Sequence, residues 1–192
     1  MPLEMPPLCK FRRPALTLFL LTVFSGTACA EESASGTYLM DVAFTLTAVT
    51  DYRYRGLSLS NKKPALQAEL SVGHHSGLYT RLWGSSIADN GGADIETQAT
   101  LGYNVEFGAF SADVQGAYYF YPGAAADNYG EVAMRLGRSF GPSELGATVS
   151  YAPAQRNIGN VDNLYAGLDG SAPLLGGPVT ISASFGVEDG AF

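Results

Sequence analysis

Apolar and polar residues alternate over an unusually long stretch at residues 42–56 (VAFTLTAVTDYRYRG), where the even positions run from Val42 to Tyr54 and the odd positions are mostly small, polar or charged. A period of two is typical of a β-strand, since a helix cannot present this pattern as two faces. At about 3.3 Å per residue the strand would be about 45 Å long, beyond the ~17–20 Å of most strands. Tilted by about 40°, it would cross an apolar band about 25 Å tall. We therefore predict a transmembrane β-strand here.

The same alternation predicts eight further strands, over 66–72, 78–85, 94–104, 110–121, 129–140, 145–151, 163–172 and 179–187. In 78–85 it leaves open which way Tyr79, Arg81 and Trp83 point. No helical segment separates the strands, which favours an antiparallel meander. Long polar connections mostly alternate with tight turns, as in outer-membrane barrels with long outer loops and short periplasmic turns. The predicted fold is all-β, an antiparallel up-and-down transmembrane β-barrel with nine strands visible.

Bacterial single-chain barrels have even numbers of strands, so a count of nine predicts further strands. Barrels of this class commonly end on an aromatic residue that follows alternating apolar residues. Phe192 is aromatic, but Gly190, Glu188 and Gly186 occupy the alternate positions before it. We expect the sequence to stop short of the true C-terminus, and the complete barrel to have about ten to twelve strands.

The first thirty residues have the pattern of a secretory signal peptide. Lys10, Arg12 and Arg13 precede an apolar run over 15–24, and Ala28-Cys29-Ala30 supplies the small residues of a cleavage site. That run is too short for a membrane-spanning helix, which needs about twenty residues. The predicted organisation is a signal peptide over 1–30, a short periplasmic N-terminus over 31–41 and a barrel domain over 42–192.

Composition narrows the class of protein further. Both cysteines, Cys9 and Cys29, lie in the predicted leader, so the mature chain cannot be a disulfide scaffold or hold a Cys-rich zinc site. The formal net charge is −7, and cleavage would remove three basic residues. An acidic chain without a basic cluster argues against nucleic acid as a partner. Only 15% of residues are charged, against about 25% in a typical soluble domain.

Several motifs, in order along the chain, resemble the TorF porin family. They are TDYRYRGLSLS (50–60), KPALQ (63–67), SGLYTRLWGSS (76–86), DIE (94–96), YYFYPG (118–123) and YGEV (129–132). The resemblance implies an outer-membrane β-barrel whose relatives continue beyond the point where this chain ends. It implies much more about location and fold than about a transported substrate.

The polar face of the predicted strands supplies candidates that face a lumen. They are Asp51, Arg53, Arg55, Glu69, Asp94, Glu96, Asp113, Glu131 and Arg135. Charged side chains that line a pore set its ion preference, and the pair Arg53 and Arg55 would favour anions against the opposing carboxylates. The alternative is a structural ion network in which the first strand's charges pair with Glu69 or Glu96.

Aromatic residues near strand ends are candidates for the girdles that barrels place at membrane interfaces. They are Tyr52, Tyr54, Trp83, Tyr103, Tyr118, Phe120 and Phe140. A sugar-stacking platform built from Trp83 and residues 118–121 is the alternative interpretation.

The one catalytic suggestion is His74-x-Ser76, which has the spacing of the His and Ser of an outer-membrane lipid A deacylase. A nucleophilic serine needs a base within hydrogen-bond reach and an orienting acid. The pair lies in a tight turn that strand counting places on the periplasmic side, so we expect two solvated turn histidines and no enzyme. His74 and His75 lack an obvious third metal ligand, and we expect no metal or cofactor.

Together these patterns predict an outer-membrane barrel that acts as a porin or small channel for passive passage of solutes or ions. A lipid-modifying enzyme and a plugged structural barrel are the alternatives; a lipocalin-like binder would need an apolar interior. The expected partners are outer-membrane lipid, periplasmic chaperones and the barrel-assembly machinery. The expected location is the cell outer membrane, reached through the inner membrane by the signal peptide.

Overall fold

The computed structural model describes residues 39–176 and 179–191. The predicted signal peptide and most of the predicted N-terminus therefore lie outside the described residues. Nine antiparallel strands form one sheet in chain order. They are β1 (Met40–Val49), β4 (Ala65–His74), β5 (Leu78–Asn90), β6 (Ala93–Phe107), β7 (Phe110–Phe120), β8 (Tyr129–Phe140), β9 (Ser143–Ala152), β10 (Asn163–Pro173) and β11 (Thr180–Gly190). The predicted nine-stranded meander is confirmed.

Short elements fill some of the connections. Strands β2 (Arg53–Tyr54) and β3 (Leu57–Ser58) pair with each other in a separate two-stranded sheet. Three short 3₁₀-helices follow, η1 (Ala125–Asp127), η2 (Arg156–Ile158) and η3 (Leu174–Gly176). Within the two described ranges, no helix has the length and apolar character needed to cross a membrane.

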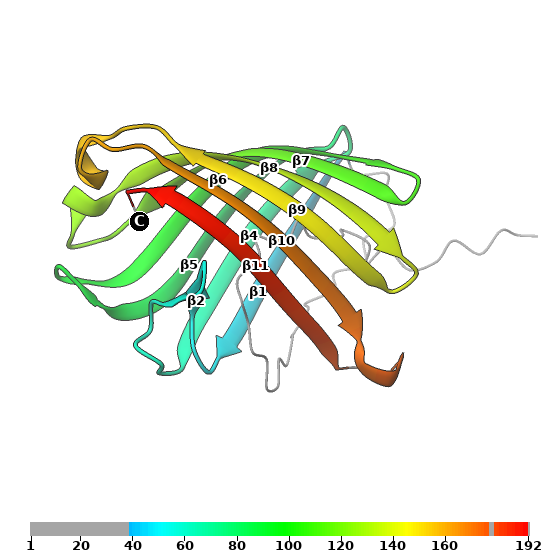
Figure 1. The fold of residues 1–192 in the computed structure, drawn as a ribbon, viewed down its shortest axis with the longest axis horizontal. Helices are drawn as coiled ribbons and strands as arrows, with labels where there is room; N and C mark the ends of the chain where they lie inside the picture. The colour runs from blue at the N-terminus through cyan, green and yellow to red at the C-terminus, as the bar shows by residue number, and fades with distance from the viewer. Residues whose placement is uncertain (1–38, 177–178, 192) are drawn as a thin grey trace, which may run out of the picture.

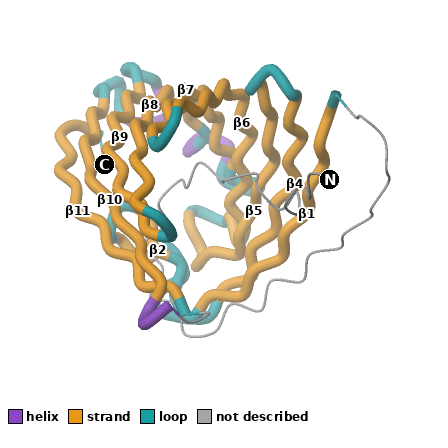
Figure 2. Tube along the Cα trace, turned by 90° about the vertical axis from the view of Figure 1, so that its right-hand side faces the viewer, coloured by secondary structure: helices purple, strands orange, loops and turns teal. Residues whose placement is uncertain are grey.

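The sheet is curled but not closed. Figure 2 shows β1 and β11 on opposite sides of an arch of strands, and each is an edge strand in the hydrogen-bonded order. Long connections gather at one end, as Figure 1 shows on its left, and most of the tight turns lie at the other. The sequence predicted that the strand ends at residue 85 and that a loop follows it. In the structure β5 continues to Asn90, and the turn consists of Gly91 and Gly92, both with positive φ.

The register separates two chemically different faces. Phe44, Leu70 and Leu82 lie side by side on neighbouring strands and are exposed on the outer face. Thr45 and Glu69, one residue along, lie on the concave face. Among outward positions of the nine described strands, only Arg138 and Asp189 are charged, and both lie near strand ends. A slip of one residue would exchange the two faces, so the register is strongly specified.

The concave face is mainly polar and buried. Among the described residues, the clusters of buried apolar side chains are small, one around Tyr119 and Tyr129 and one around Val49 and Tyr52. Buried polar groups are costly unless they are hydrogen-bonded. The interior is therefore stabilised chiefly by side-chain hydrogen bonds and ion pairs rather than by an apolar core.

Glycines on the concave face leave room for large side chains of the same strand or of a neighbouring strand. Tyr79 on β5 lies opposite Gly102 on β6, and its ring occupies the space of a β-carbon at Gly102. Tyr165 covers Gly167 and Gly186 in the same way. In these places the absence of a side chain allows a tyrosine to lie across the sheet and reach an interior partner.

We predict that Gly102→Ala destabilises the protein, because its new methyl group would displace Tyr79 from its hydrogen bonds with Asp113 and Gln115. The expected loss is about 1–3 kcal/mol of unfolding free energy, as for overpacking elsewhere. Urea unfolding from lipid vesicles measures it. Gly116→Ala is the control, since nothing lies within 4 Å of a β-carbon there. Equal stability of the two variants would contradict the packing described here.

Candidate functional site

The chain leaves the sheet after β1 and folds onto the concave face. The long strand predicted over 42–56 is wrong in its second half, because β1 ends at Val49. Residues 50–64, which we call the inward hairpin, contain β2 and β3. The turn between them places Arg55 at φ 48° and Gly56 at φ 88°, a left-handed conformation that glycine adopts without strain.

Tyr52 and Tyr54 anchor the inward hairpin to the sheet. The Tyr52 hydroxyl donates to Glu96 on β6 at 2.9 Å, and its ring packs edge-on against Trp83 at 5.5 Å. The Tyr54 hydroxyl lies 3.1 Å from that of Tyr119 on β7. These three aromatic residues, Tyr52, Tyr54 and Trp83, therefore lie in the interior, and their prediction as girdle residues is wrong. Inward hydroxyls gain partners there that a lipid-facing position would not offer.

Asp51 organises the hairpin internally. Its carboxylate accepts hydrogen bonds from Ser58 at 2.5 Å and Ser60 at 3.1 Å, and pairs with Arg53 at 2.6 Å. The Ser58 hydroxyl bond lowers the pKa of Asp51 below its ordinary value of 3.8. Asp51 and Arg53 thus stabilise a local turn, and the structure pairs them within the hairpin rather than with Glu69 or Glu96, the partners that the structural alternative predicted.

Arg55 joins the hairpin to two distant strands. Its guanidinium group pairs with Glu131 on β8 and, at 2.6 Å, with Glu188 on β11. It also lies over the rings of Tyr54 and Tyr165, at 4.8 Å and 4.5 Å. The Arg55 side chain is only 7% exposed, so these partners replace water around a buried charge.

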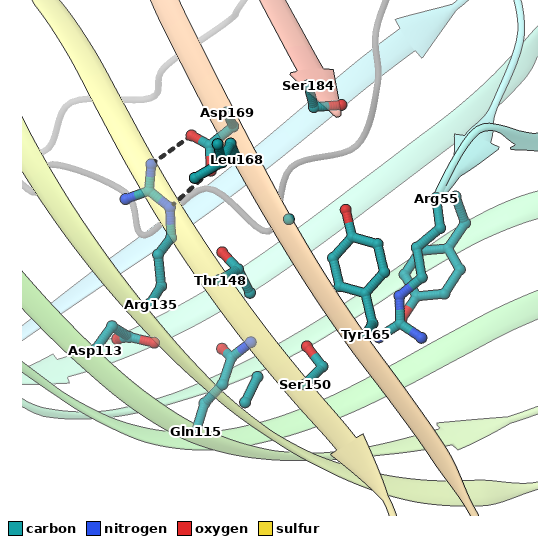
Figure 3. A pocket seen from close by; sticks show the side chains of 13 residues that line it. Arg55, Asp113, Gln115, Arg135, Thr148, Ser150, Tyr165, Leu168, Asp169 and Ser184 are labelled. Carbon is teal, nitrogen blue, oxygen red and sulfur yellow. Dashed lines mark hydrogen bonds and ion pairs between the residues drawn. The ribbon is translucent and has the colours of Figure 1, made fainter. Parts of the chain in front are cut away.

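Arg135 forms a second buried ion cluster in the interior. It binds Glu144 at 2.9 Å and Asp169 at 2.6 Å, and Figure 3 shows its guanidinium group directed toward Asp169. Its guanidinium group lies where a β-carbon at Gly146 would stand. Larger residues at Gly146 would therefore displace the cluster.

A third group of polar side chains surrounds Asp113 on β7. The Tyr79 hydroxyl donates to Asp113 Oδ1 at 3.1 Å and lies 3.0 Å from Gln115 Oε1. Arg81 donates to that same amide oxygen at 2.9 Å and lies 3.9 Å from Glu69. The three groups together fill much of the concave face.

A cavity of about 40 Å³ lies among these groups (Figure 3). Its lining includes Tyr54 and Arg55 of the hairpin together with residues of β7 to β11. Such a volume admits about one water molecule or a small ion, since a water molecule occupies about 30 Å³ in the liquid. Within the described residues, no group of three or more His, Cys, Asp or Glu is arranged to hold a metal ion.

Residues 31–192 match a family model described as "Bacterial protein of unknown function (Gcw_chp)". The chain belongs to the Gcw_chp family. No curated protein and no solved structure gives a significant match. The Gcw_chp description assigns no activity, so the resemblance to the TorF porin family stays a prediction from the motifs.

The Gcw_chp sheet places five of the nine predicted lumen-facing residues on its concave face: Glu69, Glu96, Asp113, Glu131 and Arg135. Arg55 reaches that face from the hairpin, Asp51 and Arg53 pair with each other within the hairpin, and Asp94 is exposed near the start of β6. The prediction missed Arg81, Glu144, Asp169 and Glu188. Each occupies a polar position of the alternating pattern, and that position is the signal from which its place on the concave face could have been predicted.

The remaining girdle candidates lie on the outer face, where Tyr103, Tyr118, Phe120 and Phe140 are each at least 38% exposed. Sequence reasoning missed Phe107, Phe110 and Tyr151, which are also exposed there.

His74 and Ser76 contact each other in the turn between β4 and β5. His74 Nδ1 lies 2.8 Å from the Ser76 hydroxyl oxygen. The Ser76 backbone N–H also donates to Nδ1, at 3.1 Å. That nitrogen therefore serves as a local acceptor of the turn. The expectation that the Gcw_chp chain is not an enzyme stays a prediction.

We predict that Arg55→Gln destabilises this Gcw_chp protein far more than Arg53→Gln. Loss of the Arg55 charge leaves Glu131 and Glu188 without their ion pairs in the interior, which costs about 3–5 kcal/mol. Arg53 is 35% exposed and its pair contributes less than about 1 kcal/mol. Trp83, the chain's single tryptophan, packs on the hairpin and reports urea unfolding by fluorescence. Similar midpoints for the two variants would show that Arg55 does not stabilise the hairpin.

Proposed function

We propose that the chain forms the wall of an outer-membrane β-barrel with a narrow polar interior, through which small ions pass passively. The observation that carries the proposal is the chemistry of the two faces. Exposed aliphatic side chains cover the outside of all nine strands, while ion pairs and hydrogen bonds fill the inside. This is the reverse of a soluble sheet protein, whose apolar residues would be buried.

Aromatic side chains form two groups on the outer face, one toward each end of the strands. At the tight-turn end, the rings of Phe107 and Phe110 stack at 5.8 Å, and Arg138 lies over Phe110 and Phe140 at 5.1 Å and 4.6 Å. At the other end, the rings of Tyr118 and Phe120 pack edge-on at 4.6 Å. Aromatic girdles with a flanking basic residue are typical of membrane interfaces.

The spacing of these groups supports a membrane between them. Phe110 and Tyr118 lie on β7 with Ala112, Val114 and Gly116 as the outward residues between them. Eight residues span about 27 Å along a strand, or about 20 Å across a membrane at a tilt of about 40°. This approaches the apolar band of about 25 Å in outer-membrane barrels.

The side chains that fill the interior favour a narrow passage over the wide aqueous channel of a porin. The inward hairpin crosses the concave face and places Arg55 between β8 and β11. Barrels with few strands fill their interiors with side chains, whereas those of about sixteen strands or more leave an aqueous channel. The filled interior also gives specific support to a second candidate, a structural barrel closed by its hairpin.

Electrical recording distinguishes the two candidates. We predict that the protein in a planar lipid bilayer gives small, discrete currents, and that Arg55→Gln increases the single-channel conductance because the hairpin loses its attachment to Glu131 and Glu188. Arg53→Gln is the matched control, since its ion pair lies within the hairpin. The absence of current from wild-type and Arg55→Gln protein, both inserted and folded, would favour the structural barrel.

A further inference from the structure

The concave face carries more carboxylates than guanidinium groups. Its arginines are Arg55, Arg81 and Arg135, and its acidic residues are Glu69, Glu96, Asp113, Glu131, Glu144, Asp169 and Glu188. Even with Glu96 left out, because two tyrosine hydroxyls bind it, the carboxylates outnumber the arginines two to one. A solute in this interior meets an excess of negative charge.

Every one of these arginines already has an acidic neighbour. Arg55 is shared by Glu131 and Glu188, and Arg135 by Glu144 and Asp169. Arg81 lies 3.9 Å from Glu69. An entering anion would have to compete with these carboxylates for each guanidinium group.

Asp113 is the carboxylate best placed to meet a cation. The residue is only 4% exposed, and it lines the cavity. Its Oδ1 accepts from Tyr79, but its Oδ2 has no hydrogen-bond partner in the part of the chain that the structure describes. Arg135, opposite Asp113 on β8, binds Glu144 and Asp169, and the Asn104 amide, which also lies close to Asp113, donates to Ala112 O at 3.4 Å.

The cavity is small. Its volume of about 40 Å³ has room for about one water molecule or a small ion. Besides Asp113, the lining offers the Asp169 carboxylate and the hydroxyls of Thr148, Ser150 and Ser184 (Figure 3). The guanidinium groups of Arg55 and Arg135 also line the cavity, and each is paired with two carboxylates. Carboxylate, amide and hydroxyl oxygens are the ligands that hard cations prefer.

We infer that the interior selects small inorganic cations over anions, with Asp113 as the carboxylate that determines this preference. The inference rests on the proposed channel function and names the class of ion that it passes. It also replaces the anion preference expected from the pair Arg53 and Arg55: Arg53 lies in the hairpin turn, and Arg55 has two acidic partners.

Reversal potentials across a planar bilayer with a tenfold KCl gradient test the inference. The expected result is a preference for K⁺ over Cl⁻ in the wild-type protein, and a K⁺/Cl⁻ permeability ratio reduced by about twofold or more in Asp113→Asn. Asp94→Asn is the matched control, since that carboxylate is exposed and lies outside the cavity, and its ratio should equal that of the wild type. Asp113→Glu keeps the charge and should keep the preference for K⁺.

If Asp113→Asn does not fold, a second variant tests the same inference. Asp169→Asn leaves Arg135 with one carboxylate partner in place of two, and should also lower the K⁺/Cl⁻ ratio. A wild-type channel that prefers Cl⁻, or a conducting Asp113→Asn protein with an unchanged ratio, would overturn the inference alone. Folded, inserted protein that passes no current would instead overturn the proposed channel on which the inference rests.

Discussion

The need to give the buried guanidinium groups of Arg55 and Arg135 acidic partners determines the arrangement of much of the interior of this protein. A sheet with an apolar outer face has to place its charged residues on the concave side, where water is scarce and an unpaired charge is costly. The structure meets this need by setting Arg55 and Arg135 each between two carboxylates from different strands. Glycine at Gly146 leaves the space that Arg135 requires.

The inward hairpin depends on the same constraint. It carries few apolar residues, and polar contacts of Tyr52, Tyr54 and Arg55 with β6, β7, β8 and β11 add to the packing of Tyr52 against Trp83. The contact with Glu188 is notable because it joins the beginning of the sheet to its last strand. The hairpin therefore links parts of the sheet that share no backbone hydrogen bonds.

Alternation of apolar and polar residues predicted the nine strands and both faces because side-chain direction in a strand is a local property. The prediction from alternation failed at Tyr52 and Tyr54. These residues continue the apolar positions of the preceding strand in sequence, although the chain has already left the sheet. The positive φ of Arg55 and Gly56 marks that departure, and the Arg-Gly pair was its only local signal. The partners of Arg55 and Arg135 could not be predicted, because those ion pairs depend on the curvature that brings distant strands together.

The most direct test of the account is a spin-label scan along β7 in lipid bilayers, which the absence of cysteine after residue 30 makes simple. Single cysteines at successive positions from 111 to 119 would carry the label. We predict that accessibility to oxygen, which concentrates in the lipid interior, alternates with a period of two and is greatest near Val114, while its neighbours Asp113 and Gln115 show low values. Equal accessibility of all positions to a water-soluble reagent would contradict a membrane-facing outer surface.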